Sequence, residues 1–300
     1  MTGQRGTTAA GRRASLLARM AAEARKAGVV PRRIHLVVAI DRLLVRLLAA
    51  APGVWVVKGG YANQLRRPDA ARFTEDLDLR LDADIAMAPV LLASALAVDA
   101  GDGLDYAVDA APSALDGPPG GGLRFLVVAR LEGAELVRFK VDVSASDVVV
   151  GPAESCGSDP VVARLGFPPS RFPVYPVDQH VAEKLHALTL PRNVENTRAR
   201  DLVDLAWFIA HFTFQSDSLA AACAATFGRR ATHAWPPVVP EPPASWGRPY
   251  AAWRSALDLP DATPAEAAAA VRRFLEPVSA GIANLAWDPD AQGWAPVGPD

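Results

Sequence analysis

The chain has 300 residues, 50% of them hydrophobic, and a formal net charge of −2. These values predict a globular protein with a sizeable core, arranged as one large domain or two of ordinary size. Two cysteines are too few for a disulfide framework in a chain of this length, and they indicate a reducing compartment.

The basic side chains are concentrated at the N-terminal end. Residues 1–46 hold ten arginines and lysines against two acidic side chains, a net charge of +8, which leaves −10 for the rest of the chain. Such asymmetry is expected of a protein that binds a polyanion at one end. The alternative is a solvated, partly disordered tail.

Helices are predicted for much of this N-terminal region. Residues 1–12 should be irregular, residues 15–27 have a helical composition, and Pro31 interrupts the pattern. From residue 34 a helix should bury one apolar stripe, with Arg42 and Arg46 on the other side. These charges exclude a secretory signal or a membrane span, so we expect a cytoplasmic protein without a membrane partner. The stripe comprises Leu36, Ile40, Leu43, Leu44 and Leu47.

Residues 54–81 carry the strongest functional signal. An apolar strand ends in a turn with Gly59 and Gly60, which lets backbone N–H groups approach phosphate oxygens closely. A second strand then carries Asp76 and Asp78, whose side chains should share one face because side chains alternate along a strand. Mg²⁺ is bound through one or two carboxylates together with substrate phosphates and water. This stretch suggests nucleotide chemistry, and the alternative is an ordinary solvated strand edge.

A third carboxylate is predicted on a neighbouring strand. Residues 85–99 should form a helix, and residues 116–122 a turn or exposed loop. Two further strands, at 123–129 and 136–143, flank a tight turn at Gly133. Alternation along the second strand puts Asp142 on its polar face, where it would join the other carboxylates if the strands lie side by side. We therefore predict a mixed sheet that carries three acidic groups.

The C-terminal part is predicted to be mainly helical. Nine prolines and glycines between residues 151 and 177 should interrupt any regular element, which places a domain boundary near residues 172–177. One helix should begin with Asp178 as its N-cap and carry Lys184, and the next should carry Asp201 and Asp204 on its polar side. Further helices are expected at 219–227, 250–257 and 264–276. The predicted division is a basic arm (1–31), a core domain (32–172) and a mainly helical C-terminal domain (173–300).

Five short motifs occur in a fixed order along the chain. They read KGG at residues 58–60, RxTxDLD at 72–78, KVDV at 140–143, AEKLHA at 182–187 and NxRxRDLxDL at 196–205. In these motifs the chain resembles the AbiEii/AbiGii family of nucleotidyltransferase toxins, whose actinobacterial members include the MenT toxins. The resemblance implies an α+β fold. It consists of a polymerase-β-type nucleotidyltransferase core, with a small mixed sheet and flanking helices, followed by a helical C-terminal domain.

The resemblance also implies roles for individual residues. Asp76 and Asp78 match the carboxylates that bind Mg²⁺ or Mn²⁺, and Asp142 is the third acidic residue, which helps to activate the attacking hydroxyl. Lys184 matches the lysine that contacts NTP phosphates, and Asp201 matches the acidic residue of the last motif. Contacts with the substrate are expected from Lys58, Gly59, Gly60, Thr74, Arg198 and Arg200.

Two positions near the first strand need separate comment. The first motif of the superfamily commonly reads Gly-Ser, whereas Gly60 leaves phosphate contacts to backbone N–H groups here. Thr74 precedes Asp76 by two residues, so a phosphate on its hydroxyl would place negative charge where metal and triphosphate must sit. The resemblance implies that an antitoxin can silence the enzyme in this way. The alternative is a threonine chosen for its strand propensity.

We therefore predict the toxin of a bacterial toxin–antitoxin system, with an NTP, an RNA acceptor and a cognate antitoxin as partners. The enzyme would move NMP from NTP to RNA, at the 3′ end of tRNA, and so block translation. The basic N-terminal region and three arginines would hold the RNA backbone. Alternatives are nucleotidyl transfer to a protein or small molecule, and a non-catalytic nucleic-acid-binding module. The three arginines are Arg192, Arg198 and Arg200.

Overall fold

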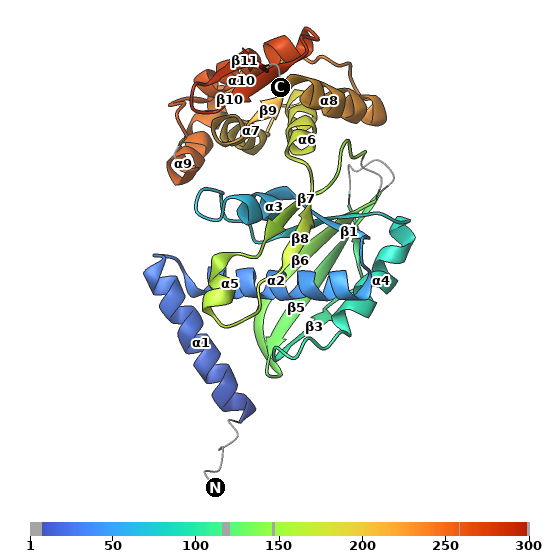
Figure 1. Ribbon diagram of the computed structural model, residues 1–300, viewed down its shortest axis with the longest axis vertical. Coiled ribbons are helices and arrows are strands. Elements are labelled where there is room, and N and C mark those ends of the chain that lie inside the picture. Colours follow the sequence, from blue (N-terminus) through green and yellow to red (C-terminus); the bar gives the residue numbers. More distant parts are fainter. Residues whose placement is uncertain (1–7, 116–120, 146–147, 258, 299–300) are drawn as a thin grey trace. The chain divides into compact units, whose positions relative to one another are not determined.

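A computed structural model describes residues 8–115, 121–145, 148–257 and 259–298. The chain divides into two compact units (Figure 1). The first consists of Met1–Ser146 and Glu154–Val174, and the second of Asp147–Ala153 and Tyr175–Asp300.

The first unit begins with two helices, α1 (Ala9–Lys26) and α2 (Pro31–Ala50). Helix α1 begins earlier than expected because Thr8 caps it, its hydroxyl accepting a hydrogen bond from the Gly11 N–H at 3.1 Å. Pro31 occupies the first turn of α2, where its missing N–H costs nothing, so it opens this helix. The prediction of irregular structure was therefore wrong for residues 9–12, and residues 1–7 lie outside the described residues.

A mixed sheet forms the body of the first unit. Its order is β3-β5-β6-β2-β1-β8-β7, with β4 paired to β5. The pairs β2–β6 and β1–β8 are parallel, and the other neighbours are antiparallel. The strands are β1 (Trp55–Lys58), β2 (Leu77–Leu81), β3 (Leu104–Val108), β4 (Ser113–Ala114), β5 (Gly122–Leu131), β6 (Ala134–Ser144), β7 (Glu154–Gly157) and β8 (Arg171–Val174).

One face of this sheet is buried and the other is polar. Figure 1 shows α2 running across the strands, and the Tyr106 hydroxyl on β3 donates to the Ala39 carbonyl of α2 at 2.8 Å. Leu77 and Leu79 on β2 are buried, as are Phe139, Val141 and Val143 on β6, in agreement with the predicted alternation. The charged side chains of β2 and β6 therefore project from the opposite face.

The β5–β6 hairpin confirms the predicted strand pair around Gly133. Glu132 and Gly133 both have positive φ, 50° and 78°, which suits a two-residue turn between antiparallel strands. The strands extend beyond their predicted ends at both sides. Of the predicted loop at 116–122, residues 116–120 lie outside the described residues.

Shorter helices complete the first unit, and some were not predicted. The expected helix after β2 is present as η1 (Ile85–Met87) and α4 (Ala88–Leu96), and α3 (Gly59–Arg66) follows β1 directly. The prediction that residues 151–177 lack regular structure was wrong, since they form β7, α5 (Pro160–Arg164) and β8. Pro160 occupies the first turn of α5 behind its cap, Asp159, where a proline is compatible with a helix.

The arginines of α2 do not face solvent, which corrects the predicted two-sided helix. Helix α2 packs against α1, α4 and the sheet, so it is covered on several sides. Arg42 is 3% exposed and Arg46 1% exposed, and both bind Asp102, at 2.9 Å from Arg42 Nε and 2.7 Å from Arg46 Nη2. These two charges support the fold and cannot form an RNA-binding surface.

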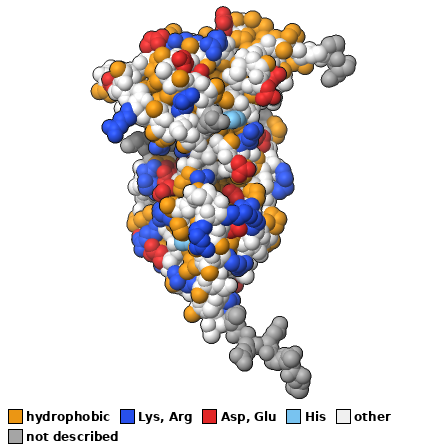
Figure 2. All heavy atoms as spheres, turned by 90° about the vertical axis from the view of Figure 1, so that its left-hand side faces the viewer, with side chains coloured by type: hydrophobic (Ala, Val, Ile, Leu, Met, Phe, Trp, Pro, Cys, Tyr) orange, Lys and Arg blue, Asp and Glu red, His pale blue; other side chains and the backbone are white. Residues whose placement is uncertain are grey.

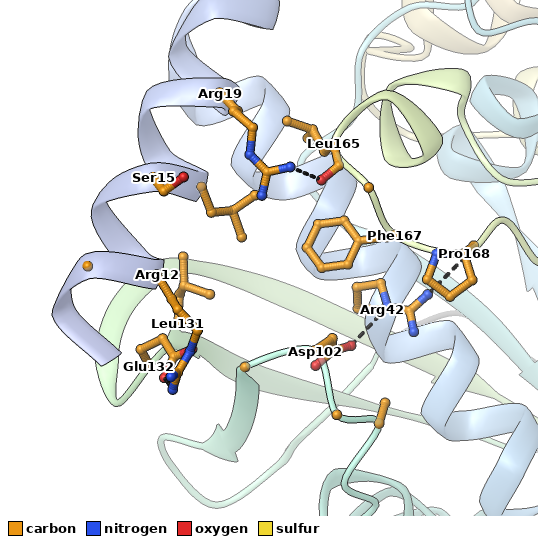
Figure 3. Close-up of a pocket in the computed structure, with 16 residues that line it drawn as sticks. Arg12, Ser15, Arg19, Arg42, Asp102, Leu131, Glu132, Leu165, Phe167 and Pro168 are labelled. Atoms are coloured by element: carbon orange, nitrogen blue, oxygen red, sulfur yellow. Dashed lines mark hydrogen bonds and ion pairs between the residues drawn. The ribbon is translucent and has the colours of Figure 1, made fainter. Parts of the chain in front are cut away.

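Other N-terminal arginines also have partners within the first unit. Arg12 binds Glu132 at 2.6 Å, and Arg19 donates to the Leu165 carbonyl at 2.7 Å. Figure 3 shows these arginines around a hollow between α1, α2 and the loop before β8, with their guanidinium groups turned to acceptors on its wall. Figure 2 shows basic and acidic side chains intermingled on the face that it presents. Part of the excess positive charge, at Arg12, Arg42 and Arg46, is therefore paired with carboxylates of the same unit.

A pH-dependent contribution to stability is predicted for Asp41. Its side chain is fully buried on α2, and burial raises the pKa of the carboxyl from 3.8 to about 6. Because the folded-state pKa is the higher one, stability is greatest below the unfolded-state pKa and falls as the pH rises through about 6. A shift of about two units corresponds to about 3 kcal/mol of unfolding free energy.

Asp41→Asn removes this titration. We expect the unfolding free energy of the variant, relative to the natural sequence, to rise between about pH 4 and pH 7, as measured by urea denaturation at successive pH values. Asp105→Asn, which removes a half-exposed aspartate on β3, is the control. Its unfolding free energy relative to the natural sequence should stay nearly constant over the same pH range. A constant difference for Asp41→Asn as well would contradict the predicted titration.

The second unit is helical with a small sheet. Helix α6 packs on α7 and α8, and α10 packs on α7. Helix α6 is capped by Pro176, without a side-chain hydrogen bond, so the prediction of Asp178 as the N-cap was wrong. The helices are α6 (Val177–Thr189), α7 (Ala199–His211), α8 (Ser216–Arg230), η2 (Ala244–Trp246), α9 (Gly247–Leu257) and α10 (Pro264–Ser279).

The small sheet of the second unit was not predicted. It is formed by β9 (Phe214–Gln215), β10 (Leu285–Asp288) and β11 (Gly293–Pro296), in the order β11-β10-β9. Phe274 of α10 contacts Trp287 and Trp294 of this sheet, with ring centroids 4.9 and 5.3 Å apart. These tryptophans belong to the core of the unit. Among the described residues, no helix is long and apolar enough to cross a membrane.

Candidate active site on the polar face of the sheet

A row of four charged residues crosses the polar face of the first unit's sheet. Lys58 on β1 is paired in register with Asp78 on β2. Asp78 is in turn paired with Asp142 on β6, and Asp142 is paired with Arg124 on β5. We call these four residues the charged row. The side-by-side placement of β2 and β6 is the condition on which the prediction for Asp142 depended, and it is met.

The order of charges along this row has an electrostatic reason. Neighbouring strands lie about 4.8 Å apart, so Asp78 and Asp142 are close enough to repel each other. Two like charges about 5 Å apart repel by about 3 kcal/mol at an effective dielectric constant of about 20. Lys58 and Arg124 stand on the outer sides of the two carboxylates, where their positive charges offset this repulsion.

Asp76 lies beside the row, although not on the strand as predicted. Strand β2 begins at Leu77, so Asp76 is in the segment that leads into it. The Asp142 hydrogen bonds and charge raise the pKa of Arg124, and the charges of Asp76 and Asp78 raise it further, which places both near the guanidinium. The Asp76 carboxylate makes no ion pair with any residue that the structure describes.

Thr74 packs beside the same segment. Its backbone N–H donates to the Gln64 side-chain oxygen at 3.0 Å, and its hydroxyl donates to the Asp76 carbonyl at 3.4 Å. The side chain is half-buried. Thr74 therefore helps to fix the backbone that carries Asp76.

Gly59 and Gly60 begin a helix and do not form the predicted turn. Helix α3 starts at Gly59, directly after the strand that ends in Lys58. A Cβ atom at Gly59 would lie 1.8 Å from Asp78 Oδ2, and one at Gly60 would lie 2.9 Å from the Thr74 Cβ. Both glycines are thus needed for the close packing of residues 74–78, quite apart from any contact with phosphate.

Gly59→Ala is predicted to displace the Asp78 carboxylate. Gly59 has φ +59°, and Gly53 has φ +77° with no atom within 4 Å of an added Cβ, so Gly53→Ala is a matched control for backbone strain. We expect the control to lose about 1 kcal/mol of unfolding free energy. Gly59→Ala should lose about 2 kcal/mol more, and it should also lose transfer activity because the Asp78 carboxylate is displaced. Equal losses in thermal or urea unfolding would show that Asp78 moves aside without cost.

Arg124 is the site residue that sequence reasoning missed. It donates two hydrogen bonds to the Asp142 carboxylate, from Nε at 2.8 Å and from Nη2 at 2.6 Å. Its position on β5 opposite Asp142 could be suspected from the predicted hairpin, but the register had to be known to one residue.

A second cluster lies in the second unit around Lys184. Its ammonium binds Asp201 and Asp204, each at 2.8 Å, and the side chain is 23% exposed. Burial lowers the pKa of Lys184, but the charges of Asp204 and Asp201 raise it by more, so the net shift is upward. Both aspartates are buried by α6 and α7, and Asp201 also lies 3.6 Å from Arg198.

The remaining predicted contacts are exposed at the start of α7. Arg198 precedes the helix and is 48% exposed, and the guanidinium of Arg200 stacks over the Trp253 ring at 5.3 Å from its centroid. The predicted site residues thus fall into two groups, one in each unit. The first unit holds Lys58, Gly59, Gly60, Thr74, Asp76, Asp78 and Asp142, and the second unit holds Lys184, Arg198, Arg200 and Asp201.

Most of the chain matches a known protein family. Residues 42–289 match the family described as nucleotidyl transferase AbiEii toxin of type IV toxin–antitoxin systems. The chain belongs to the AbiEii family of nucleotidyltransferase toxins. An AbiEii toxin is a nucleotidyltransferase, which uses an NTP as substrate, and its family implies an antitoxin partner.

Solved structures of nucleotidyltransferases are also similar to this AbiEii chain. MenT4, a nucleotidyltransferase toxin from Mycobacterium tuberculosis H37Rv, has 21% sequence identity and a TM-score of 0.53, over 90% of this chain and 99% of that chain. A protein from H. pylori, provisionally assigned as a nucleotidyltransferase, has 16% identity and a TM-score of 0.37, over 81% of this chain and 96% of that chain. The likeness to MenT4 concerns the fold. Among curated proteins, none matches the sequence significantly.

The carboxylates of this AbiEii member fit a divalent metal ion in part. Asp76 and Asp78 supply the hard oxygen donors that Mg²⁺ prefers, beside the first N–H groups of α3. The third carboxylate, Asp142, is turned to Arg124. Within the described ranges, no three acidic, histidine or cysteine side chains are arranged to hold a metal ion together.

Proposed function

We propose that this AbiEii enzyme is a Mg²⁺-dependent nucleotidyltransferase that moves NMP from an NTP to the 3′ end of tRNA and thereby blocks translation. The observation that carries the proposal is the charged row with Asp76 beside it. Asp78 and Asp142 are register partners on one face of the sheet, Asp76 lies just before β2, and the adjacent helix start can be occupied only by glycine.

The proposed roles follow from the chemistry of the reaction. An RNA hydroxyl attacks the α-phosphorus of the NTP, and pyrophosphate leaves from the opposite side. A bound Mg²⁺ supplies charge stabilisation for the attacking and leaving oxygens. Asp76 and Asp78 would hold this ion, Asp142 would accept the proton of the attacking hydroxyl, and the N–H groups of Gly59 and Gly60 would bind phosphate oxygens.

The sheet supports a polymerase-β-type assignment of the core. In that superfamily a D-x-D pair and a third carboxylate lie on neighbouring strands, as Asp76, Asp78 and Asp142 do here in and beside β2 and β6. The mixed sheet of the first unit, with α2 on one face, also supports this assignment, although it has eight strands among the described residues and is larger than predicted.

The RNA surface that we propose is smaller than the charge distribution suggested. Arg42 and Arg46 are buried, and Arg12 is bound to Glu132. Arg198 and Arg200 are exposed, and the stacking of Arg200 on Trp253 creates a planar surface on which an RNA base can stack. Arg192 is half-buried and its guanidinium donates to the Ala187 carbonyl, so its contribution is the smallest of the three.

Transfer of label from NTP tests the proposal. The purified protein is incubated with total tRNA and each α-³²P-labelled NTP in turn, with Mg²⁺ or with EDTA, and the products are separated on denaturing gels. We expect label on tRNA with Mg²⁺ only, and less label for the Arg198→Glu, Arg200→Glu double variant as salt rises. Label on protein or on a small molecule, with none on RNA, would overturn the proposed acceptor.

We further propose that the antitoxin silences the enzyme through Thr74. A phosphate on its hydroxyl would add negative charge next to Asp76 and crowd Gly60, which the Thr74 side chain already contacts closely. Intact mass measurement of the toxin co-expressed with its antitoxin should show one phosphate, absent in Thr74→Val. A phosphate elsewhere, or none, would remove this proposal.

A further inference from the structure

We propose that Arg124 is a latch that holds the Asp142 carboxylate until the triphosphate of an NTP takes the guanidinium away. This inference rests on the proposed nucleotidyltransferase function. It adds Arg124 as a residue that binds the substrate and makes the release of Asp142 depend on NTP.

The closed latch uses the whole Asp142 carboxylate. Arg124 Nε donates to one carboxylate oxygen at 2.8 Å, and Nη2 donates to the other at 2.6 Å. The two residues are register partners on adjacent antiparallel strands, so their side chains lie next to each other on one face of the sheet. The two hydrogen bonds and the positive charge of Arg124 weaken Asp142 both as a ligand for a cation and as an acceptor for the proton of a hydroxyl.

The location of the latch argues against a purely structural pair. The Asp142 side chain is 15% exposed and that of Arg124 is 41% exposed, so the guanidinium can leave without repacking the core. Other exposed arginines of this sheet, such as Arg130, have partners away from the charged row. Arg124, by contrast, pairs directly with a carboxylate of the row.

A triphosphate is the ligand whose chemistry can open the latch. The planar guanidinium fork binds a phosphate with the same two-bond geometry that it uses for a carboxylate, and phosphates carry more negative charge. The charges of Asp76 and Asp78 act on Arg124, and Asp78 lies against Gly59 at the start of α3, so the proposed phosphate site and Arg124 flank the same carboxylate. Exchange of Asp142 for phosphate keeps the guanidinium paired and sets the carboxylate free.

The latch predicts two opposite effects of one substitution. Arg124→Ala should bind Mn²⁺ more tightly in the absence of NTP, because Asp142 is then free to contribute. The same variant should bind a non-hydrolysable NTP analogue about tenfold more weakly, since a charge-assisted pair of hydrogen bonds is lost. Free Mn²⁺ is measured by electron paramagnetic resonance, and binding of the analogue is measured by calorimetry, both with Mg²⁺ and in EDTA.

Two further variants define the interpretation. Arg130→Ala is the matched control, since Arg130 lies on the same strand, is 39% exposed and faces Asp105 at 3.6 Å. It should change neither constant. Arg124→Lys keeps the positive charge but only one of the two hydrogen bonds. It should therefore also bind Mn²⁺ more tightly and the NTP analogue more weakly, each by less than Arg124→Ala does. If thermal unfolding shows that Arg124→Ala does not fold, Arg124→Lys is used to test the latch instead.

The possible results separate the latch from the function on which it rests. If the natural sequence and the Arg124 variants bind the analogue equally and bind Mn²⁺ equally, Arg124 is a structural partner and the latch is overturned alone. If the natural sequence binds no NTP analogue even with Mg²⁺ present, the proposed function fails and the latch with it. Tighter Mn²⁺ binding together with weaker binding of the analogue, confined to the Arg124 variants, supports the latch.

Discussion

Asp76→Asn should reduce nucleotidyl transfer about a thousandfold while leaving the fold intact. The substitution keeps the size of the side chain and removes the charge that makes it a ligand for a hard cation. Asp76 precedes β2, is half-buried and makes no ion pair with the described residues, so its charge has no structural partner to lose. Loss of one preorganised charge at a reacting phosphate typically costs a hundredfold to about a thousandfold or more.

The measurement is transfer of label from α-labelled NTP to tRNA, with thermal unfolding recorded in parallel. Glu75→Gln is the matched control, because Glu75 is the adjacent carboxylate but is 57% exposed and binds Arg32 at 3.2 Å. We expect the control to retain activity within about twofold. Transfer by Asp76→Asn at the rate of the control would refute the assignment of this face of the sheet as the catalytic one.

Alternation along strands is the part of the fold that the sequence predicts well. In β6 the apolar residues Val141 and Val143 face the core and Asp142 faces away, as expected from a period of two. The tight turn at Gly133 was equally clear, because positive φ at adjacent positions demands residues that tolerate it. These local signals were sufficient to bring Asp78 and Asp142 together as a hypothesis.

Arg124 could not be predicted because a bulge changes the register. At the turn, Leu131 is paired with Ala134, and counting back from that pair would place Leu123 opposite Asp142. A register shift between Ala129 and Arg130 moves the pairing by one residue, so that Arg124 takes that position. No residue type in the strand announces this shift.

The buried arginines show a different limit of sequence reasoning. Charge at Arg42 and Arg46 suggested a solvated side of α2, because a lone buried arginine is costly. The cost is met by Asp102, which lies far along the chain and accepts from both guanidinium groups. Only the tertiary structure reveals such a partner, and with it the loss of two charges from the expected RNA surface.

Lys184→Met should destabilise the second unit by about 3 kcal/mol as well as abolish transfer. The lysine neutralises Asp201 and Asp204, which are 8% and 3% exposed, and its removal leaves two buried like charges together. The AbiEii resemblance assigns the same lysine to the NTP phosphates. A loss of activity in this variant alone would therefore have two explanations.

A triple variant separates these explanations. Lys184→Met combined with Asp201→Asn and Asp204→Asn removes the charged cluster as a whole, so much of the lost unfolding free energy should return in urea denaturation. If Lys184 binds the triphosphate, calorimetry on the folded triple variant should still show weakened NTP binding. Lys26→Met, at the exposed end of α1, controls for loss of a lysine elsewhere. Recovery of NTP binding together with stability would make Lys184 a structural residue, whose role is to hold α6 against α7.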